Sequence, residues 1–275
     1  MSDIKVSLCV TAYNRPVLLK ECVRSFFQTS LYDRDKLELI IVDNGSTNSE
    51  IIEFIRTLDP PCKEYSYILN EKNDFPTCLK YAKVQARGKA KGNYFIDCPD
   101  DHLFLVKSDW ISESIEHIDS ATNVGCVIHF AYPAYRLRKP NNAMRPHVLS
   151  DSFYESLYKG YADYHLMSKK IYKEVGEINY DLEKQSLGEA EKDYMRRTLE
   201  LGYRRNMMKY PVAAINDDAS SGMKIEGYEL IQPFSKEELV DPFKNLQRPI
   251  CNEELVSFAI QNNKIKKIEN FQKVY

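Results

Sequence analysis

Three carboxylates stand close together in "YFIDCPDDHLF", residues 94–104: Asp97, Asp100 and Asp101. They follow an apolar run, and Pro99 lies between them. Charges gathered at the end of a buried strand are costly unless they are paired or bind something. Carboxylate oxygens are ligands that Mg²⁺ and Mn²⁺ prefer. The cluster is therefore a candidate metal site, although a surface turn broken by Pro99 would have a similar sequence.

A second group of acids lies in "GEAEKDYMRRTLELG", residues 188–202. At helical spacing one stripe is formed by Leu187, Ala190, Tyr194, Thr198 and Leu201, and Glu191 falls inside it. A carboxylate on an inward face is poised to act as a general base, because burial raises the pKa of such groups. Asp193 is a second candidate base, but an ion pair with Arg197 one turn later explains it as well.

The elements that must position these groups alternate between strand and helix over the first hundred residues. The strands are expected at 5–13, 37–44, 64–70 and 93–98, and the helices at 15–30, 49–59 and 75–88. Such a series predicts an α/β fold with a parallel sheet between layers of helices. Pro16 fits the first turn of the first helix, with Asn14 as its expected cap.

Polar side chains follow each of these four strands. They are Thr11, Tyr13 and Asn14, then Asp43 and Asn44, then Asn70 and Asn73, then the acidic cluster. Ligands of such sheets bind beyond the carboxyl ends of the strands, and amides, carboxylates and an aromatic ring suit a nucleotide. The chain has neither G-x-G-x-x-G after its first strand nor a P-loop, which argues against a dinucleotide dehydrogenase or a P-loop enzyme. Without a glycine cradle, a cation held by carboxylates could balance the charge of a nucleoside diphosphate.

The second half alternates less regularly. A helix is expected at 108–118, a strand at 123–132, a strand and short helix within 161–175, a helix at 188–201 and a strand at 205–215. The basic stretch with Arg136, Arg138, Lys139 and Arg145 is either a solvated loop or a lid on phosphates. From about residue 226 the composition changes, and we expect an appendage laid over the domain.

Composition limits the function classes. With a net charge of −2 and a pI near 6.3, the chain shows no overall footprint for nucleic acid. It has neither an apolar run of about 18 residues nor a signal peptide, so a cytoplasmic protein is expected, with peripheral membrane association left open. The seven cysteines are scattered singly, which is typical of reduced, buried thiols.

Several stretches together resemble a known family. "VSLCVTAYNRPVLLKECVRSFF", "LELIIVDNGSTNSEI", "ARGKAKGNYFIDCPDDHLF" and "GEAEKDYMRRTLELGYR" are similar to GT-A-fold glycosyltransferases of family 2, in the family's order, from about residue 4 to about residue 220. The resemblance implies a nucleotide-diphospho-sugar transferase fold with a mostly parallel central sheet flanked by helices. It does not extend to the last fifty residues, which we expect to form a C-terminal helical appendage. It divides the chain into a glycosyltransferase domain at 1–225, with halves at about 1–104 and 105–225, and the appendage at 226–275.

The resemblance also implies roles for individual residues. It places Thr11, Tyr13, Asn14, Arg15, Asp43, Asn70 and Asp100 in the nucleotide pocket. Tyr13 could instead be an ordinary aromatic at the edge of the core, and Asp43 a helix cap. Counting back from "GYR", Glu191 falls where the family has its catalytic Asp.

The acidic cluster departs from the family's metal motif, because "DCPDD" has one residue more than the common L-D-x-D-D form. Aligning the final acid puts Asp101 on the metal with help from Asp100, whereas aligning the strand makes Asp97 the first acid. The first alignment is favoured, because Pro99 lets the chain turn out of the sheet. His102 could be a further ligand, with a surface or helix-entry histidine as the favoured alternative, and Asp217 either replaces the family's third metal contact or lies in an acidic turn.

These expectations describe an inverting glycosyltransferase that uses Mn²⁺ or Mg²⁺. The donor would be a nucleotide sugar, expected to be UDP-linked, and the acceptor a hydroxyl of a glycan or glycoconjugate, as in polysaccharide biosynthesis. One alternative is a non-catalytic relative that binds glycans or partners. Another is a sugar nucleotidyltransferase, against which the absence of glycine in "TAYNRP" argues.

Overall fold

We analysed a computed structural model of the chain, which describes residues 4–73, 78–131, 147–148, 153–156, 165–179, 189–215, 227–246 and 248–269. The helices are α1 (Pro16–Thr29), α2 (Ser49–Thr57), α3 (Cys78–Lys89), α4 (Trp110–Ser120), α6 (Lys169–Val175), α7 (Glu189–Glu200), α8 (Lys236–Phe243) and α9 (Asn252–Gln261), with a 3₁₀ turn at Arg34–Lys36. The strands are β1 (Val6–Ala12), β2 (Leu37–Asp43), β3 (Glu64–Leu69), β4 (Tyr94–Pro99), β5 (His102–Phe104), β6 (Val106–Lys107), β7 (Val124–Ile128), β8 (His147–Val148), β9 (Phe153–Ser156), β10 (His165–Ser168), β11 (Arg204–Met208), β12 (Ala213–Ile215), β13 (Tyr228–Leu230), β14 (Phe234–Ser235) and β15 (Ile265–Lys267).

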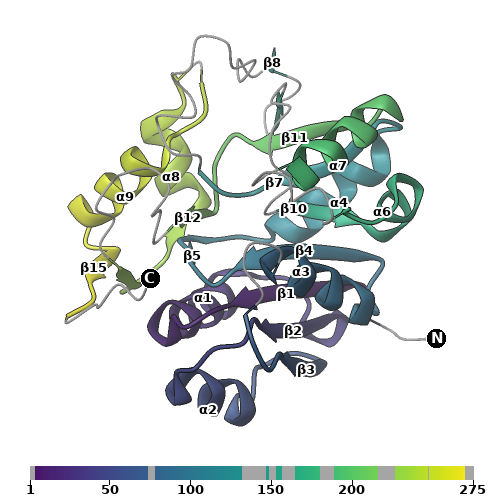
Figure 1. The fold of residues 1–275 in the computed structure, drawn as a ribbon. Coiled ribbons are helices and arrows are strands. Elements are labelled where there is room, and N and C mark those ends of the chain that lie inside the picture. The colour runs from purple at the N-terminus through teal and green to yellow at the C-terminus, as the bar shows by residue number, and fades with distance from the viewer. Residues whose placement is uncertain are drawn as a thin grey trace.

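The central sheet has the order β3-β2-β1-β4-β10-β7-β11-β9-β8 (Figure 1). The four strands expected in the first hundred residues are adjacent and parallel, which confirms the α/β fold predicted from the sequence. In this register Ala12 lies opposite Asp43, and Thr11 lies opposite Pro99. The carboxyl ends of β1, β2 and β4 therefore meet at one edge of the sheet.

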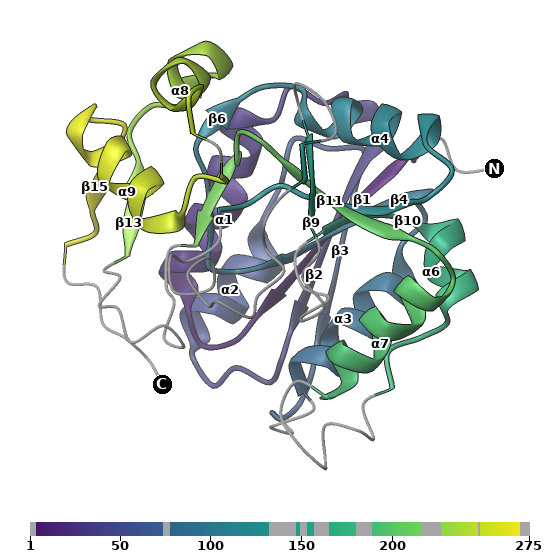
Figure 2. The ribbon, with the colours of Figure 1, turned by 90° about the horizontal axis from the view of Figure 1, so that it is seen from above.

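Helices cover both faces of the sheet. Figure 2 shows α3, α6 and α7 over one face, and α1 and α4 over the other, with α2 packed against α1. All seven residues of β1 and all seven of β2 are buried, as continuous apolar strands between two helical layers must be.

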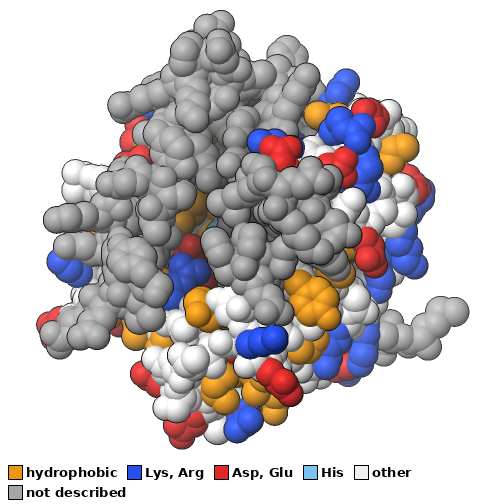
Figure 3. Space-filling model, in the orientation of Figure 1, with side chains coloured by type: hydrophobic (Ala, Val, Ile, Leu, Met, Phe, Trp, Pro, Cys, Tyr) orange, Lys and Arg blue, Asp and Glu red, His pale blue; other side chains and the backbone are white. Residues whose placement is uncertain are grey.

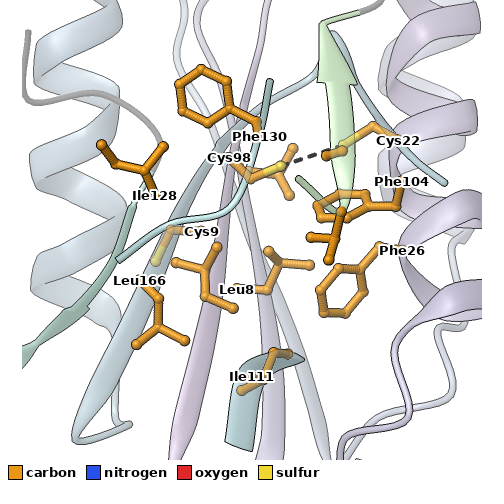
Figure 4. Close-up of a cluster of buried hydrophobic side chains, with 14 of the residues drawn as sticks. Leu8, Cys9, Cys22, Phe26, Cys98, Phe104, Ile111, Ile128, Phe130 and Leu166 are labelled. Atoms are coloured by element: carbon orange, nitrogen blue, oxygen red, sulfur yellow. Dashed lines mark hydrogen bonds between the residues drawn. The ribbon is translucent and has the colours of Figure 1, made fainter. Parts of the chain in front are cut away.

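The core between the sheet and α1 is drawn in Figure 4. Leu8 and Cys98 point from adjacent strands toward α1, where Phe26 and Phe104 meet edge to face with ring centroids 5.1 Å apart. The thiols of Cys22 and Cys98 share a hydrogen bond, with their sulfur atoms 3.6 Å apart, and form no disulfide. Burial raises the pKa of Cys98 well above its usual value, so this pair belongs to the reduced, buried thiols that the sequence predicted.

The fourth strand is expected to end at Cys98, before Pro99. Pro99 is instead the last residue of β4, and the turn falls at Asp100 and Asp101. The strand tolerates a proline there because β10 pairs with β4 only at Tyr94, Phe95 and Ile96. On the β1 side, Asp100 N donates to Thr11 O at 3.0 Å, so the N–H that Pro99 lacks costs no ladder bond.

The segment expected as one strand at 205–215 forms two strands in different sheets. β11 belongs to the central sheet, whereas β12 pairs with β5 antiparallel. Lys209 and Tyr210 form a bend between them, and Pro211 follows. The sequence pattern missed β5 and β6 altogether, because each is only two or three residues long.

The C-terminal part contains the expected helices, α8 and α9, together with three short strands. β13 pairs with β15, and β14 pairs in parallel with β6. Ser235 begins α8 with a capping box, in which its side chain accepts from Glu238 N at 3.2 Å while Glu238 accepts from Ser235 N at 2.7 Å.

Candidate functional site

The turn after β1 is fixed to the loop after β2 by Asn14. Its backbone N–H donates to Ser46 Oγ at 2.8 Å, and its Oδ1 accepts from Thr47 N at 2.9 Å and Asn48 N at 3.2 Å. The expected helix-capping role of Asn14 is therefore wrong: it has a positive φ of 51° and leaves Arg15 as the N-cap residue of α1. Asn tolerates this left-handed conformation better than most residues. Asn14 thus holds two strand-end loops together.

Asp43 is buried at the end of β2 and organises the loop that follows. Its Oδ2 accepts from Gly45 N at 3.2 Å and Ser46 N at 2.8 Å, and its Oδ1 accepts from the Ser46 hydroxyl. Burial raises the pKa of Asp43, although these hydrogen bonds oppose the shift. The cap of α2 is Asn48, not Asp43, since the Asn48 side chain accepts from Glu50 N at 2.8 Å.

The three acids of the cluster have different surroundings. Asp97 faces α3 and forms a buried ion pair with Arg87, in which Nε donates to Oδ1 at 3.1 Å and Nη2 donates to Oδ2. Both side chains are at most 3% exposed. Asp97 is thus fully engaged inside the protein, which favours the alignment that assigns the metal to the later acids.

Asp100 and Asp101 share Arg15, which comes from the end of β1. Arg15 Nε donates to Asp100 Oδ2 at 3.3 Å, Nη2 donates to Asp100 Oδ1, and Nη1 lies 3.4 Å from Asp101 Oδ2. Tyr13 N also donates to Asp100 Oδ2, at 3.3 Å. The turn after β1 and the turn after β4 therefore form one polar cluster of Tyr13, Arg15, Asp100 and Asp101.

The two acids differ in charge state. Burial, partly opposed by Arg15, raises the pKa of Asp100 to about 7. Burial also disfavours the charge of Asp101, but Arg15 and His102 outweigh it and lower the pKa of this carboxyl. Two adjacent carboxylates hold protons unequally, and the more accessible Asp101 is the one that stays ionised.

One oxygen of Asp101 is a candidate ligand atom for a cation. Its Oδ1 is buried and accepts no hydrogen bond within the described part of the chain. His102 Nδ1 lies 3.4 Å from this atom. The expectation of a surface or helix-entry histidine is wrong, because His102 begins β5 and is 1% exposed, with its ring 5.3 Å from that of Phe130.

The residues present fit a partial cation site. Among described residues, no three His, Cys, Asp or Glu side chains are grouped so that they could hold a metal by themselves. Asp101 and Asp100 could supply two oxygen ligands, with substrate phosphates and water completing the shell, as Mg²⁺ sites commonly arrange.

Two further residues of the predicted nucleotide pocket lie at the same edge. Thr11 is buried, and its Oγ1 has no hydrogen-bond partner among the described residues. Asn70, at the end of β3, exchanges two hydrogen bonds with Gln85 of α3, at 3.0 and 3.1 Å. Asn70 therefore ties the third strand end to α3, and Thr11 keeps a free hydroxyl.

The inward stripe of α7 is largely as predicted. Ala190, Tyr194 and Thr198 are buried, whereas Leu201 is 54% exposed, because the helix ends at Glu200 and Gly202 turns the chain with a φ of 85°. Leu187 lies outside the described residues.

The two candidate bases, Glu191 and Asp193, are two residues apart on α7. Asp193 Oδ1 accepts from Arg196 and its Oδ2 from Arg197, both at 2.8 Å. Burial acts against the charge of Asp193, but these arginines prevail and lower its pKa. Glu191 belongs to α7, but its side chain lies outside the described part of the structure, as do Asp217 and the basic residues Arg136, Arg138, Lys139 and Arg145.

Sequence reasoning missed Arg87, which determines the role of Asp97. Its guanidinium lies 5.2 Å from the Phe95 ring centroid and 4.9 Å from that of Tyr172. A signal was present: Lys83 and Arg87 are one helical turn apart and follow the small residues Ala82 and Ala86 that face the sheet, and all four are buried. A basic residue on such a face needs an internal acid.

On the face in Figure 3, the described Lys and Arg side chains are interspersed with Asp and Glu, so the described residues form no large patch of one charge there. Across the part of the chain that the structure describes, every helix is too short or too polar to cross a membrane.

Three comparisons with known proteins bear on this site. The family model for glycosyl transferase family 2 matches residues 7–176. A comparison with curated proteins found no match.

Solved structures with a similar fold include two that were determined in complex with nucleotide sugars. S. aureus TarS 1-349 in complex with UDP-GlcNAc has a TM-score of 0.56 at 13% identity, over 81% of this chain and 62% of that one. The mannosyltransferase PcManGT from Pyrobaculum calidifontis, in complex with GDP-Man and Mn²⁺, has a TM-score of 0.53 at 19% identity, over 73% of this chain and 53% of that one.

The chain thus spans about half of PcManGT and 35% of the longer S. aureus TarS chain. At these identities the likeness establishes the fold alone, and the fold is the one expected from the sequence. The family model, in contrast, covers more than half of the 275 residues and includes both the β1 turn and the acidic cluster. The chain therefore belongs to glycosyl transferase family 2.

Proposed function

We propose that this protein is an inverting, metal-dependent glycosyltransferase that moves a sugar from a nucleoside diphosphate sugar to an acceptor hydroxyl. The observation that carries the proposal is the cluster of Arg15, Asp100 and Asp101 at the carboxyl ends of β1 and β4. It combines a cation for phosphates with two acids for a divalent metal, at the edge where such sheets bind ligands.

The donor would lie along the strand ends. Tyr13 is half-buried and can contact the nucleobase, while the free hydroxyl of Thr11 and the carboxylate of Asp43 lie beside it on adjacent strands. We propose uridine as the nucleoside, in keeping with the TarS structures, which were solved with UDP and UDP-GlcNAc. The GDP-Man complex of PcManGT makes guanosine the alternative to test.

Asp101, assisted by Asp100, would hold Mn²⁺ or Mg²⁺. The ion would neutralise charge on the leaving diphosphate. Arg15 now neutralises the two acids, and it would be released to the diphosphate when a cation takes its place. Asp100 and Asp101 could thus exchange the Arg15 guanidinium for a metal ion, and their buried charge would be compensated in both states.

Glu191 is the proposed general base. The acceptor oxygen would attack the anomeric carbon while the bond from this carbon to the phosphate oxygen breaks, and the hydroxyl proton would pass to the Glu191 carboxylate. The nucleoside diphosphate leaves from the opposite face, which inverts the anomeric centre. Asp193 is the less suitable base, because Arg196 and Arg197 hold both of its oxygens.

A binding panel tests the donor and the metal. Thermal shift with UDP, GDP and their sugars, with and without Mn²⁺, should show stabilisation that needs both the nucleotide and the metal. Asp101→Asn should abolish the Mn²⁺-dependent part, whereas Asp33→Asn, which changes an exposed acid far from the cluster, should not. Mn²⁺-dependent stabilisation that survives in Asp101→Asn would contradict the metal assignment.

Turnover tests the base. Slow hydrolysis of the donor can be followed by release of the nucleoside diphosphate without knowing the acceptor. Glu191→Gln should retain donor binding and lose turnover, and Asp193→Asn should keep both. If donor binds but no variant or wild-type protein turns it over, a non-catalytic relative becomes the better description; formation of a nucleotide sugar from a sugar phosphate would indicate a nucleotidyltransferase. The glycan acceptor, a cytoplasmic location, contact with a membrane surface and the division into domains stay predictions.

A further inference from the structure

The C-terminal residues 227–269 are joined to the strands that leave the acidic cluster. β14 pairs with β6, and Phe234 N donates to Leu105 O at 2.8 Å. α9 contacts β12, and Figure 1 shows α8 and α9 beside β5 and β12. This part of the chain therefore packs against β6 and β12, two strands that lie outside the central sheet.

One side chain makes the connection at β12. Asn252, the first residue of α9, is fully buried. Its Oδ1 accepts from Ile215 N at 2.8 Å, and its Nδ2 donates to Ile215 O at 3.0 Å. A single carboxamide thus satisfies both backbone groups of Ile215, as a neighbouring strand would.

The register of β12 against β5 explains why Ile215 takes a partner outside the strand pair. Ile215 lies opposite His102 in the antiparallel pair of β12 and β5. In such a pair, a residue whose N–H and C=O both point outward cannot bond to the facing strand. Asn252 therefore occupies the outer edge of β12, and β12 is held between Asn252 and β5.

β5 begins immediately after Asp101. Within the described residues its ladder consists of β12 alone, and an isolated two-stranded ribbon is only marginally stable. His102, the first residue of β5, also lies 3.4 Å from Asp101 through Nδ1 and Oδ1. The position of the Asp101 carboxylate therefore depends on how firmly β12 holds β5.

We propose that Asn252 is a positioning residue, which fixes β12 against β5 and thereby places Asp101 for the metal and the donor diphosphate. The inference rests on the proposed function for the identity of the ligand. It gives the C-terminal part a role in the donor site, with no contact to the donor itself.

The test compares two asparagines of the same helix. Asn252→Ala removes both hydrogen bonds to Ile215. Asn262→Ala is the matched control, because the exposed side chain of Asn262, the C-cap residue of α9, donates to Phe258 O of the same helix, at 2.8 Å. Asn252→Ser keeps a small hydrogen-bonding side chain without adding a buried charge, and it serves as a milder variant if Asn252→Ala does not fold.

Two readouts separate positioning from general stability. Hydrogen exchange should become about tenfold faster in a peptide covering 101–106 for Asn252→Ala, because both side-chain hydrogen bonds that hold β12 are lost. Mn²⁺ binding in the presence of UDP, measured by the electron paramagnetic resonance of free Mn²⁺, should weaken about tenfold at a temperature where the variant is folded. Asn252→Ser should fall between Asn252→Ala and wild type, and Asn262→Ala should match wild type in both.

Unchanged exchange at 101–106, or unchanged Mn²⁺ and UDP binding with faster exchange, would each overturn the inference, even if the melting temperature falls. If wild-type protein binds neither Mn²⁺ nor UDP, the proposed function fails instead. The exchange measurement then still reports whether Asn252 holds β5, so the two failures are distinguishable.

Discussion

The buried ion pair of Arg87 and Asp97 should be a major contributor to stability, and replacing one partner tests this. Arg87→Met keeps an unbranched apolar stem of similar length and removes the guanidinium. Asp97 then loses two hydrogen bonds and the positive charge paired with it, while remaining 3% exposed. The rings of Phe95 and Tyr172 also lose the cation that lies 5.2 and 4.9 Å from their centroids.

The expected loss is large, because a buried carboxylate is left without compensation. Breaking such a pair costs about 3–5 kcal/mol, out of a total stability of about 5–15 kcal/mol for an ordinary domain. Urea unfolding can be followed through Trp110, the only tryptophan of the chain, which is fully buried. The urea concentration at the midpoint of unfolding should fall by this loss of free energy divided by the m value, which is the slope of the unfolding free energy against urea concentration.

The double variant Arg87→Met with Asp97→Asn provides the decisive comparison. Removing both charges should recover more than about 1 kcal/mol relative to Arg87→Met alone, since neutral partners avoid the uncompensated charge. Lys91→Met, which breaks the exposed pair with Glu64, should leave the midpoint unchanged. A loss below about 1 kcal/mol in Arg87→Met would refute the reasoning, because it would equal that of a surface pair.

Other predictions concern the strand-end loops and the acids. Gly45→Ala should destabilise the protein by more than about 1 kcal/mol, because the residue has a φ of 81° and a Cβ would lie 2.2 Å from Lys72 C. Gly88→Ala, near the end of α3 with nothing within 4 Å of its Cβ, should instead stabilise by about 0.5–1 kcal/mol, and thermal unfolding of both variants checks the contrast. Because burial raises the pKa of Asp100 to about 7, its ionised form gains population as the pH rises through that value, so Mn²⁺ binding with UDP should strengthen from about pH 6 to about pH 8. Titrations in which the affinity is flat over this range, or in which Asp100→Asn shows the same slope as wild type, would contradict this assignment.

Much of the fold could be predicted from local patterns. Continuous apolar runs such as 37–43 predicted buried parallel strands, and the helical stripe at Ala190, Tyr194 and Thr198 predicted the inward face of α7. The patterns failed where elements are short or paired at a distance. β5 and β6 have too few residues to show a period, and the division of 205–215 into β11 and β12 follows from pairing with β7 and β5, which a local window does not contain.

The candidate site shows the same division. The sequence identified the acids and the polar strand ends, because alternation of strands and helices forces strand ends to one edge of a parallel sheet. It also favoured Asp100 and Asp101 over Asp97 through the turn-forming Pro99. The role of Asn14 was wrong because its partners, Thr47 and Asn48, follow a different strand.

By itself, the sequence determined the α/β architecture, the edge that carries the polar residues and the family resemblance. The tertiary structure alone decided that Asp97 pairs with Arg87, that Arg15 bridges two acids 85 and 86 residues away, and that Asn252 holds Ile215. The physical reason is that the periodicity of apolar residues indicates which face of an element is buried. An ion pair, or a side chain that bonds to the backbone of another element, depends on the register between elements. That register is set only when the whole core packs.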